Sequence, residues 1–260
     1  MRPRLIPILL LRSGGLYKTR KFAEPVYIGD PINAVRIFNE KGVDEIVLLD
    51  IDATVEGRGP NFERITDIVS EAFVPICYGG GVRSIDDFSR LMKLGVEKVA
   101  VTSAVANDFS LITEAASLFG SQSVVVGIDV RRGLFNRLDR VVRSGKDTTR
   151  LLPLDAALAA EAAGAGEILL NSVDRDGMMS GYDEKLVSLV SDAVGIPVIA
   201  SGGAASLDDM LQAVFTGGAS AAAAGSLFVF QGKHRAVLIT YPDERAVAEA
   251  TKRHVPEKSQ

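Results

Sequence analysis

Cysteine, histidine and tryptophan are scarce in this sequence, and their scarcity excludes several kinds of site. Among 260 residues there is 1 cysteine, Cys77, so an internal disulfide framework is excluded and a reducing, cytoplasmic location is expected. The 2 histidines, His234 and His254, are too few for a conventional zinc site, and we expect neither metal nor cofactor. Cys77 lies inside an apolar run without a nearby histidine, so we expect a small buried core residue rather than a nucleophile.

A strong charge of one sign and a long apolar run are also missing. The formal net charge is −4 and the isoelectric point is near 5.4, which gives no basic footprint for nucleic acid or an anionic membrane. No apolar run approaches the ~20 residues that a bilayer-spanning helix needs. We therefore expect no nucleic-acid partner and no membrane partner. The length and the 47% hydrophobic content suffice for one large core.

An internal repeat organises the sequence. The stretch "VPICYGGGVRSIDDFSRLMKLGVEKV" is similar to "IPVIASGGAASLDDMLQAVFTGGASA", and Pro75 and Pro197 within them are 122 positions apart. The same offset aligns "GVDEIVLLDID" (42–52) with "GAGEILLNSVD" (164–174). A shared register of this length indicates two fused half-units, with a longer period than solenoid repeats have.

Short β-branched runs alternate with amphipathic stretches in both half-units. In "DDFSRLMKLG" and "DDMLQAVFTGG", apolar residues recur at three- and four-residue steps and glycine follows, as at the end of a helix. Eight strands alternating with eight helices in about 250 residues is the pattern of the (β/α)8 TIM barrel. A doubly wound open sheet is the alternative, but no G-x-G-x-x-G turn follows the first strand. We expect the strands at residues 5–10, 46–50, 76–79, 98–102, 124–129, 167–171, 197–200 and 220–224.

The repeat also sets the expected domain organisation. We expect one barrel domain over residues 1–260, with half-barrels at about 1–122 and 123–240 and a C-terminal extension at about 241–260. In such barrels the active site lies at the carboxyl ends of the strands and in the loops that follow them. Candidate site residues are therefore sought at the strand ends.

Glycine-rich turns, "YGGG" and "ASGG", follow the third and seventh strands, and "VTSA" and "AAGS" follow the fourth and eighth. Glycine lets backbone N–H groups approach an anion closely, and a following helix N-terminus favours negative charge. The alternative is that these glycines only make tight turns. Two such sites related by the repeat predict an elongated ligand with a phosphate at each end. The first anion grip comprises Gly80, Gly81, Thr102 and Ser103, and the second comprises Ser201, Gly202, Gly203, Gly225 and Ser226.

The first and fifth strands differ at one position. Both "LIPILLLRSGG" and "VVVGIDVRRG" carry an apolar run that leads into glycine. Asp129 ends the apolar run of the fifth strand, whereas Leu10 takes its place in the first. An aliphatic side chain cannot accept or donate a proton, so the two half-units differ at this position in what they can do chemically.

Charged residues stand where four of the strands begin: Arg4, Glu45, Lys98 and Glu167. Charges this close to a core need partners, because an unpaired buried charge costs several kcal/mol. Two cations and two anions therefore predict a salt-bridged ring across the barrel axis at the bottom face. The alternative is a set of ion pairs that only stabilises the bottom of the barrel.

Three stretches closely resemble the cyclase subunit of imidazole glycerol phosphate synthase: "FGSQSVVVGIDVRR", "GAGEILLNSVDRDGMMSGYD" and "IPVIASGGA". The resemblance covers roughly residues 4–230. It implies a barrel that receives ammonia from a glutaminase docked on its bottom face and uses it on a bis-phosphorylated substrate at the top. The family's acid/base pair is two aspartates, of which one matches Asp129 and the other falls on Leu10. The resemblance therefore makes Asp129 the expected catalytic residue and puts a cyclisation that needs two carboxylates in serious doubt.

Other family positions are matched as well. The charged ring matches the family's ammonia gate, which lies between the glutaminase and the barrel interior. Lys18, in "KTRK" within a long first βα loop, fits a mobile basic lid, with a solvated charge run as the alternative. The segment "GKHR" (232–235) is either the start of a surface helix or an anion contact. Beyond the two grips, the predicted ligand-binding residues are Lys18, Asp50, Asn171 and Asp176.

Further stretches resemble a side branch of this family, the glycosyl amidation-associated proteins of surface-polysaccharide gene clusters. They are "PILLLRSGGLYKTRKF", "YIGDPINAVRIFNEKGVDEIVLLDIDA" and "GSLFVFQGKHRAVLITYP". This resemblance implies an ammonia-handling subunit with a glutaminase-like partner and a separate sugar-amidating enzyme. Because Cys77 has no histidine partner, glutamine hydrolysis falls to another polypeptide. A working cyclase of histidine biosynthesis and a non-catalytic, phospho-ligand-binding activator of a glutaminase are the alternatives.

Overall fold

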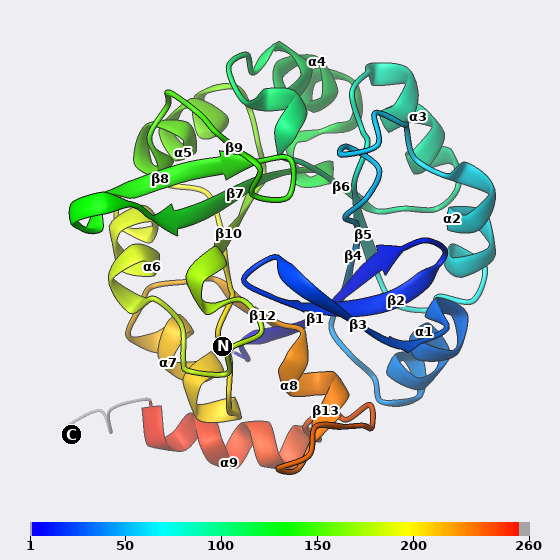
Figure 1. The fold of residues 1–260 in the computed structure, drawn as a ribbon, viewed down its shortest axis with the longest axis vertical. Helices are drawn as coiled ribbons and strands as arrows, with labels where there is room; N and C mark the ends of the chain where they lie inside the picture. Colours follow the sequence, from blue (N-terminus) through cyan, green and yellow to red (C-terminus); the bar gives the residue numbers. More distant parts are fainter. Residues whose placement is uncertain (1, 255–260) are drawn as a thin grey trace.

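The computed structural model describes residues 2–254, so residues 255–260 of the expected C-terminal extension lie outside the described residues. Parallel strands form a closed barrel, because β12 pairs with β1 and β10 pairs with β7 (Figure 1). The predicted TIM barrel is therefore confirmed. The barrel strands are β1 (Arg4–Arg12), β4 (Ile46–Asp50), β5 (Ile76–Gly79), β6 (Lys98–Val101), β7 (Val124–Arg132), β10 (Glu167–Ser172), β11 (Val198–Ser201) and β12 (Ala221–Ala224).

Helices surround the barrel (Figure 1). Polar side chains start several of them: Asp30, Ser84 and Ser206 each accept a hydrogen bond from a backbone N–H in the first turn. Because α8 has only 4 residues, α9 packs against α7 and fills the outer layer there. The helices are α1 (Pro31–Glu40), α2 (Phe62–Val69), α3 (Ile85–Lys93), α4 (Ser110–Phe119), α5 (Pro153–Ala162), α6 (Glu184–Ser191), α7 (Leu207–Phe215), α8 (Ser226–Val229) and α9 (Glu244–His254), with 3-10 turns η1 (Ser103–Val105), η2 (Ser121–Ser123), η3 (Leu134–Asn136) and η4 (Val173–Arg175).

Successive side chains of each barrel strand point alternately outward and into the barrel, which produces two apolar layers. Side chains that point outward, such as Leu9 and Leu48, share one core cluster with helix residues such as Phe38 and Phe88. Cys77 is 1% exposed and belongs to the inner layer, as predicted. Over residues 2–254, no helix has the length and apolar character that a bilayer span requires. The inner layer consists of Ile6, Ile8, Val47, Cys77, Ala100, Val125, Leu169, Ile199, Ala221 and Ala223.

Extra antiparallel strands extend three of the connections. After β1 come β2 (Gly15–Arg20) and β3 (Ala23–Gly29), and after β7 come β8 (Leu138–Val142) and β9 (Asp147–Thr148). The first connection, expected to be a long loop, is thus a hairpin, and it lies across the barrel mouth (Figure 1). After α8, a third hairpin pairs β13 (Phe230–Gln231) with β14 (Ala236–Val237). The segment "GKHR" forms its turn, so the surface helix start is wrong.

Candidate functional site

A cavity of about 910 Å³ opens at the carboxyl ends of the barrel strands. Every residue predicted for the top face lines it: both anion grips, Leu10, Asp129, Lys18, Asp50, Asn171 and Asp176. They come from both half-barrels, so the cavity spans the barrel axis. This is the position at which barrels of this kind carry their active sites.

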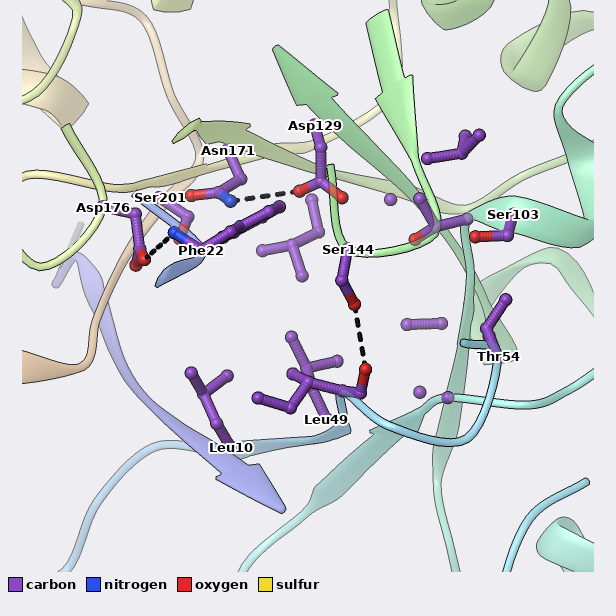
Figure 2. Close-up of a pocket in the computed structure, with 18 of the residues that line it drawn as sticks. Leu10, Phe22, Leu49, Thr54, Ser103, Asp129, Ser144, Asn171, Asp176 and Ser201 are labelled. Carbon is purple, nitrogen blue, oxygen red and sulfur yellow. Dashed lines mark hydrogen bonds between the residues drawn. The ribbon is translucent and has the colours of Figure 1, made fainter. Parts of the chain in front are cut away.

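Asp129 reaches the cavity from β7, with Asn171 of β10 beside it (Figure 2). The Nδ2 of Asn171 donates a hydrogen bond to Oδ1 of Asp129 at 3.0 Å. Burial raises the pKa of Asp129 to about 6; the Asn171 bond opposes this rise and the nearby Asp176 carboxylate adds to it. A carboxyl group with this pKa exchanges its proton close to neutral pH, so it is suited to acid/base work.

Leu10 points into the same cavity from the opposite wall, next to Leu49 (Figure 2). The two leucines are Cα partners in the β1–β4 ladder, which sets them side by side. Both are only half-buried, so apolar surface faces the cavity. The wall opposite Asp129 is therefore apolar at the position where the family resemblance places an acid.

The β2–β3 hairpin is joined to the loop after β10 through Asp176. Thr19 Oγ1 and the backbone N–H of Phe22 donate to Oδ2 of Asp176 at 2.8 and 3.3 Å. The N–H of Lys21 donates to the backbone carbonyl of Asp176 at 3.0 Å. Burial raises the pKa of the Asp176 carboxyl, and the two donors oppose the rise. The expected basic lid is thus a hairpin bonded to the cavity wall.

Lys18 belongs to β2 of this hairpin and is only 4% exposed, so it is not part of a solvated charge run. Its ammonium donates to the backbone carbonyl of Ile8 and lies against Gly225, where a Cβ atom would collide with Nζ. Burial lowers the pKa of Lys18 to about 8, with Asp176 opposing the change. The cation stands beside the second anion grip, where a bound anion would stabilise it.

The loop between β8 and β9 covers the first anion grip. The N–H of Arg143 donates to Ser103 Oγ at 3.0 Å, and Ser144 Oγ donates at 2.9 Å to a carbonyl of the loop after β4 (Figure 2). A Cβ atom on Gly145 would lie 3.1 Å from the Phe22 ring of the first hairpin. The β2–β3 and β8–β9 hairpins therefore meet above the cavity.

The glycines of the grips occupy backbone positions that favour glycine. Gly80 and Gly202 have φ values of +122° and +86°. A Cβ atom on either would collide with a backbone carbonyl oxygen, that of Asp50 or Ser172. Tight turns alone explain these glycines. The hydroxyl groups of the grips carry the case for a ligand, and they belong to Thr102, Ser103, Ser201 and Ser226.

Asp50 differs from the other predicted ligand-binding residues, because its own loop occupies its carboxylate. The guanidinium of Arg58 donates two hydrogen bonds to it, at 2.7 and 3.0 Å. The N–H groups of Asp52 and Ala53 donate to Oδ1 at 3.1 and 3.0 Å. Through these contacts Asp50 stabilises the loop after β4 and is also part of the cavity lining.

The charged residues at the bottom face form a closed ring. Arg4 contacts Glu45 at 3.3 Å and Glu167 at 2.7 Å, and Lys98 Nζ lies 2.8 Å from each glutamate. Burial raises the pKa of Glu45, with Lys98 opposing. Burial works against the charge of Lys98, but attraction to the glutamates prevails and raises its pKa. Apolar side chains of the inner layer separate this ring from the cavity.

Sequence reasoning missed much of the cavity lining that the hairpins contribute, including Phe22, Arg143 and Ser144. The available signal for the β8–β9 turn was the serine–glycine pair Ser144-Gly145. Phe22, in the β2–β3 turn, has no such pair beside it. The histidines lie outside the cavity lining: His234 is exposed, and His254 Nε2 lies 3.2 Å from Asp208 on the outer surface.

Comparisons with known proteins agree with the family resemblance of the sequence. The sequence model of one family, described as "Histidine biosynthesis protein", matches residues 4–235. The chain is 52% identical over 243 residues to the "Putative imidazole glycerol phosphate synthase subunit hisF2" of Pseudomonas aeruginosa, covering 94% of this chain and 97% of that one. A similarly named hisF3 protein of Vibrio vulnificus is 46% identical, covering 93% and 94%. "Imidazole glycerol phosphate synthase subunit HisF" of Alkaliphilus metalliredigens is 44% identical, covering 86% and 89%.

Proposed function

This chain belongs to the histidine biosynthesis protein family, among the HisF-type cyclase subunits of imidazole glycerol phosphate synthase, and on that premise we propose that it is an ammonia-handling subunit of a glutamine-dependent amidotransferase system in the cytoplasm. A glutaminase-like subunit docks on the bottom face and supplies ammonia through the charged ring. A phosphorylated ligand occupies the cavity. The ammonia serves amidation of a surface-polysaccharide sugar by a separate enzyme, in place of imidazole ring closure.

The apolar wall opposite Asp129 is the observation that carries this proposal. Ring closure by an acid/base pair needs two proton carriers, and Leu10 cannot be one of them. The cavity, its hydroxyl groups and the closed ring of charges are all retained. A barrel that keeps its ligand site and the charged ring at its bottom face, but lacks one acid, is better suited to ammonia delivery than to cyclisation.

The ring supports the ammonia route on electrostatic grounds. Neutral ammonia crosses a fully paired ring with little electrostatic penalty, whereas ammonium has to shed its hydration first. Cys77 is buried in the inner layer, and burial raises the pKa of its thiol well above the ordinary range. A thiol in that state is a poor nucleophile, so ammonia has to come from a partner subunit.

Reconstitution with a glutaminase-like subunit of the same genome tests the proposal. We expect the two chains to co-elute as a complex, and we expect glutamine hydrolysis to accelerate when the barrel is added. Failure to form a complex, together with an unchanged hydrolysis rate, contradicts an ammonia-handling role.

The missing acid is tested by restoring it. Wild type should show at most trace turnover of the bis-phosphorylated cyclase substrate with excess ammonium, and Leu10→Asp should raise it by about 10² or more. Leu49→Asp is the matched control, since it adds an acid to the same wall from the neighbouring strand. Turnover by wild type favours the second candidate below.

A working cyclase is the second candidate, and the proximity of Asp176 to Asp129 favours it. The two carboxyls interact, and burial raises the pKa of both. Asp176 then takes the role of the missing acid. In that case wild type turns the substrate over, and Asp176→Asn and Asp129→Asn each abolish the reaction. Asp176 is bonded to Thr19 and Phe22, so the hairpin has to release it first.

A further inference from the structure

The turn between β13 and β14, residues 232–235, holds Arg235 over the rim of the second anion grip. Its N–H donates to the carbonyl of Gly232 at 3.1 Å, and a φ of 51° at Arg235 keeps the turn tight. The guanidinium reaches back toward the barrel mouth. Its Nη atoms lie 3.4 Å from the carbonyl oxygen of Gly177 and 3.5 Å from Ser226 Oγ.

These contacts leave most of the hydrogen-bonding capacity of the guanidinium unused. Both distances are at the long end of the range for hydrogen bonds, and arginine carries five N–H donors. The Phe230 ring, with its centroid 4.4 Å from Cζ, supports the group from one side. Burial and the neighbouring Arg20 cation lower the pKa of Arg235, and no carboxylate among the described residues offsets them.

Other cations converge on the same place. Lys18 lies against the second anion grip on the cavity side. Arg20 belongs to the hairpin that covers the mouth, and Gly177, which Arg235 contacts, packs against the Cα of Arg20. Arg20 and Arg235 repel each other, whereas Asp176 partly offsets the charge of Lys18. An anion bound beside Arg235 relieves the repulsion between the two arginines.

We propose that Arg235 binds the phosphate group held by the second anion grip, closing over it from the solvent side while Lys18 holds it from the cavity side. This deepens the proposed function and rests on the phosphate site in it. The planar fork of a guanidinium presents parallel donors that match two phosphate oxygens. At the first grip η1 leads directly to α4, and the hairpin that covers it is β8–β9, which contacts Ser103 through the backbone N–H of Arg143. Different hairpins therefore cover the two ends of the ligand.

Titration of the full chain with inorganic phosphate tests the proposal. Backbone amide NMR signals report each site separately, with Gly203 and Ser226 for the second grip and Gly81 and Ser103 for the first. Wild type should respond at both. The affinity that each set of signals yields is then compared between variants, and thermal unfolding verifies that every variant is folded.

Arg235→Ala should weaken phosphate binding at the second grip by about 10- to 100-fold and leave the first grip unchanged. Arg235→Lys keeps the charge but loses the fork, so its affinity should lie between the two. Lys233→Ala is the matched control: it removes an exposed cation from the same turn and should bind phosphate as wild type does.

Equal affinity of Arg235→Ala and wild type at the second grip overturns the inference alone, because the ammonia-handling role is measured with the glutaminase partner. Equal losses in Arg235→Ala and Lys233→Ala also overturn it, since general attraction by positive charge then suffices. If wild type shows no phosphate response at all, both anion grips fail and the role of Arg235 fails with them.

Discussion

Replacing Asp129 by asparagine should stabilise the protein at neutral pH while it removes the proposed acid/base group. Burial raises the pKa of Asp129 from its ordinary value of 3.8 to about 6. The folded protein therefore binds this proton more tightly than the unfolded chain does. A difference of this size corresponds to at most about 3 kcal/mol of unfolding free energy, because the side chain still touches the cavity.

The sign of the pH dependence follows from the raised pKa. Below about pH 4 the carboxyl is neutral in both states and Asp129 contributes no difference. As the pH rises from about 4 to about 6, wild type loses stability, because the unfolded chain releases its proton first. Above about pH 6 the full penalty is present. Asparagine carries no charge at any of these pH values and can still accept the hydrogen bond from Asn171.

Urea unfolding of wild type and Asp129→Asn at several pH values between 4 and 8 measures the difference in unfolding free energy and its dependence on pH. The variant should be more stable by up to about 3 kcal/mol at pH 7.5, and the advantage should shrink toward pH 4. Asp67→Asn is the control, because that side chain is 55% exposed on α2 and should change stability little at any pH. An advantage that is absent at pH 7.5, or that does not depend on pH, refutes the reasoning.

Substitutions in the charged ring and at the second anion grip should change the stability and the phosphate affinity of the protein. Lys98→Met leaves Glu45 and Glu167 with Arg4 as their one remaining partner in the ring, and should lower the unfolding free energy by about 2–4 kcal/mol in urea at pH 7; an unchanged midpoint contradicts this. Gly225→Ala pushes the Lys18 ammonium aside, and should weaken phosphate binding at the second grip about tenfold with little change in the thermal midpoint. Phosphate affinity there should fall above pH 8 as Lys18 loses its charge, relative to Lys18→Arg; parallel pH profiles of the two proteins contradict that assignment.

The barrel could be predicted because its elements obey local rules. Most of the buried parallel strands are short runs rich in β-branched residues, and the internal repeat presents their order twice. The ring at the bottom followed from position alone: a charged residue at the start of a barrel strand lies near the axis, where it meets the others. Burial of Cys77 followed in the same way from its place within an apolar run.

The position of Lys18 at the mouth could be predicted, but the hairpin that carries it and the burial of its side chain could not, because they contradict the local signal. Lys18 stands in a run of positive charge, which is typical of solvated segments. Its burial depends on the carbonyl of Ile8 and on the space beside Gly225, and both are known only from the fold. Asp50 is a similar case, since only the structure shows that Arg58 occupies its carboxylate.

Asp176 has a kinetic consequence. It takes three hydrogen bonds from the hairpin above the mouth, from Thr19, Lys21 and Phe22. A molecule that fills the cavity can leave only when that hairpin lifts, and lifting it transfers all three bonds to water together. Dwell time inside the barrel is therefore governed at this aspartate, so a change there alters release rates more than it alters equilibrium occupancy.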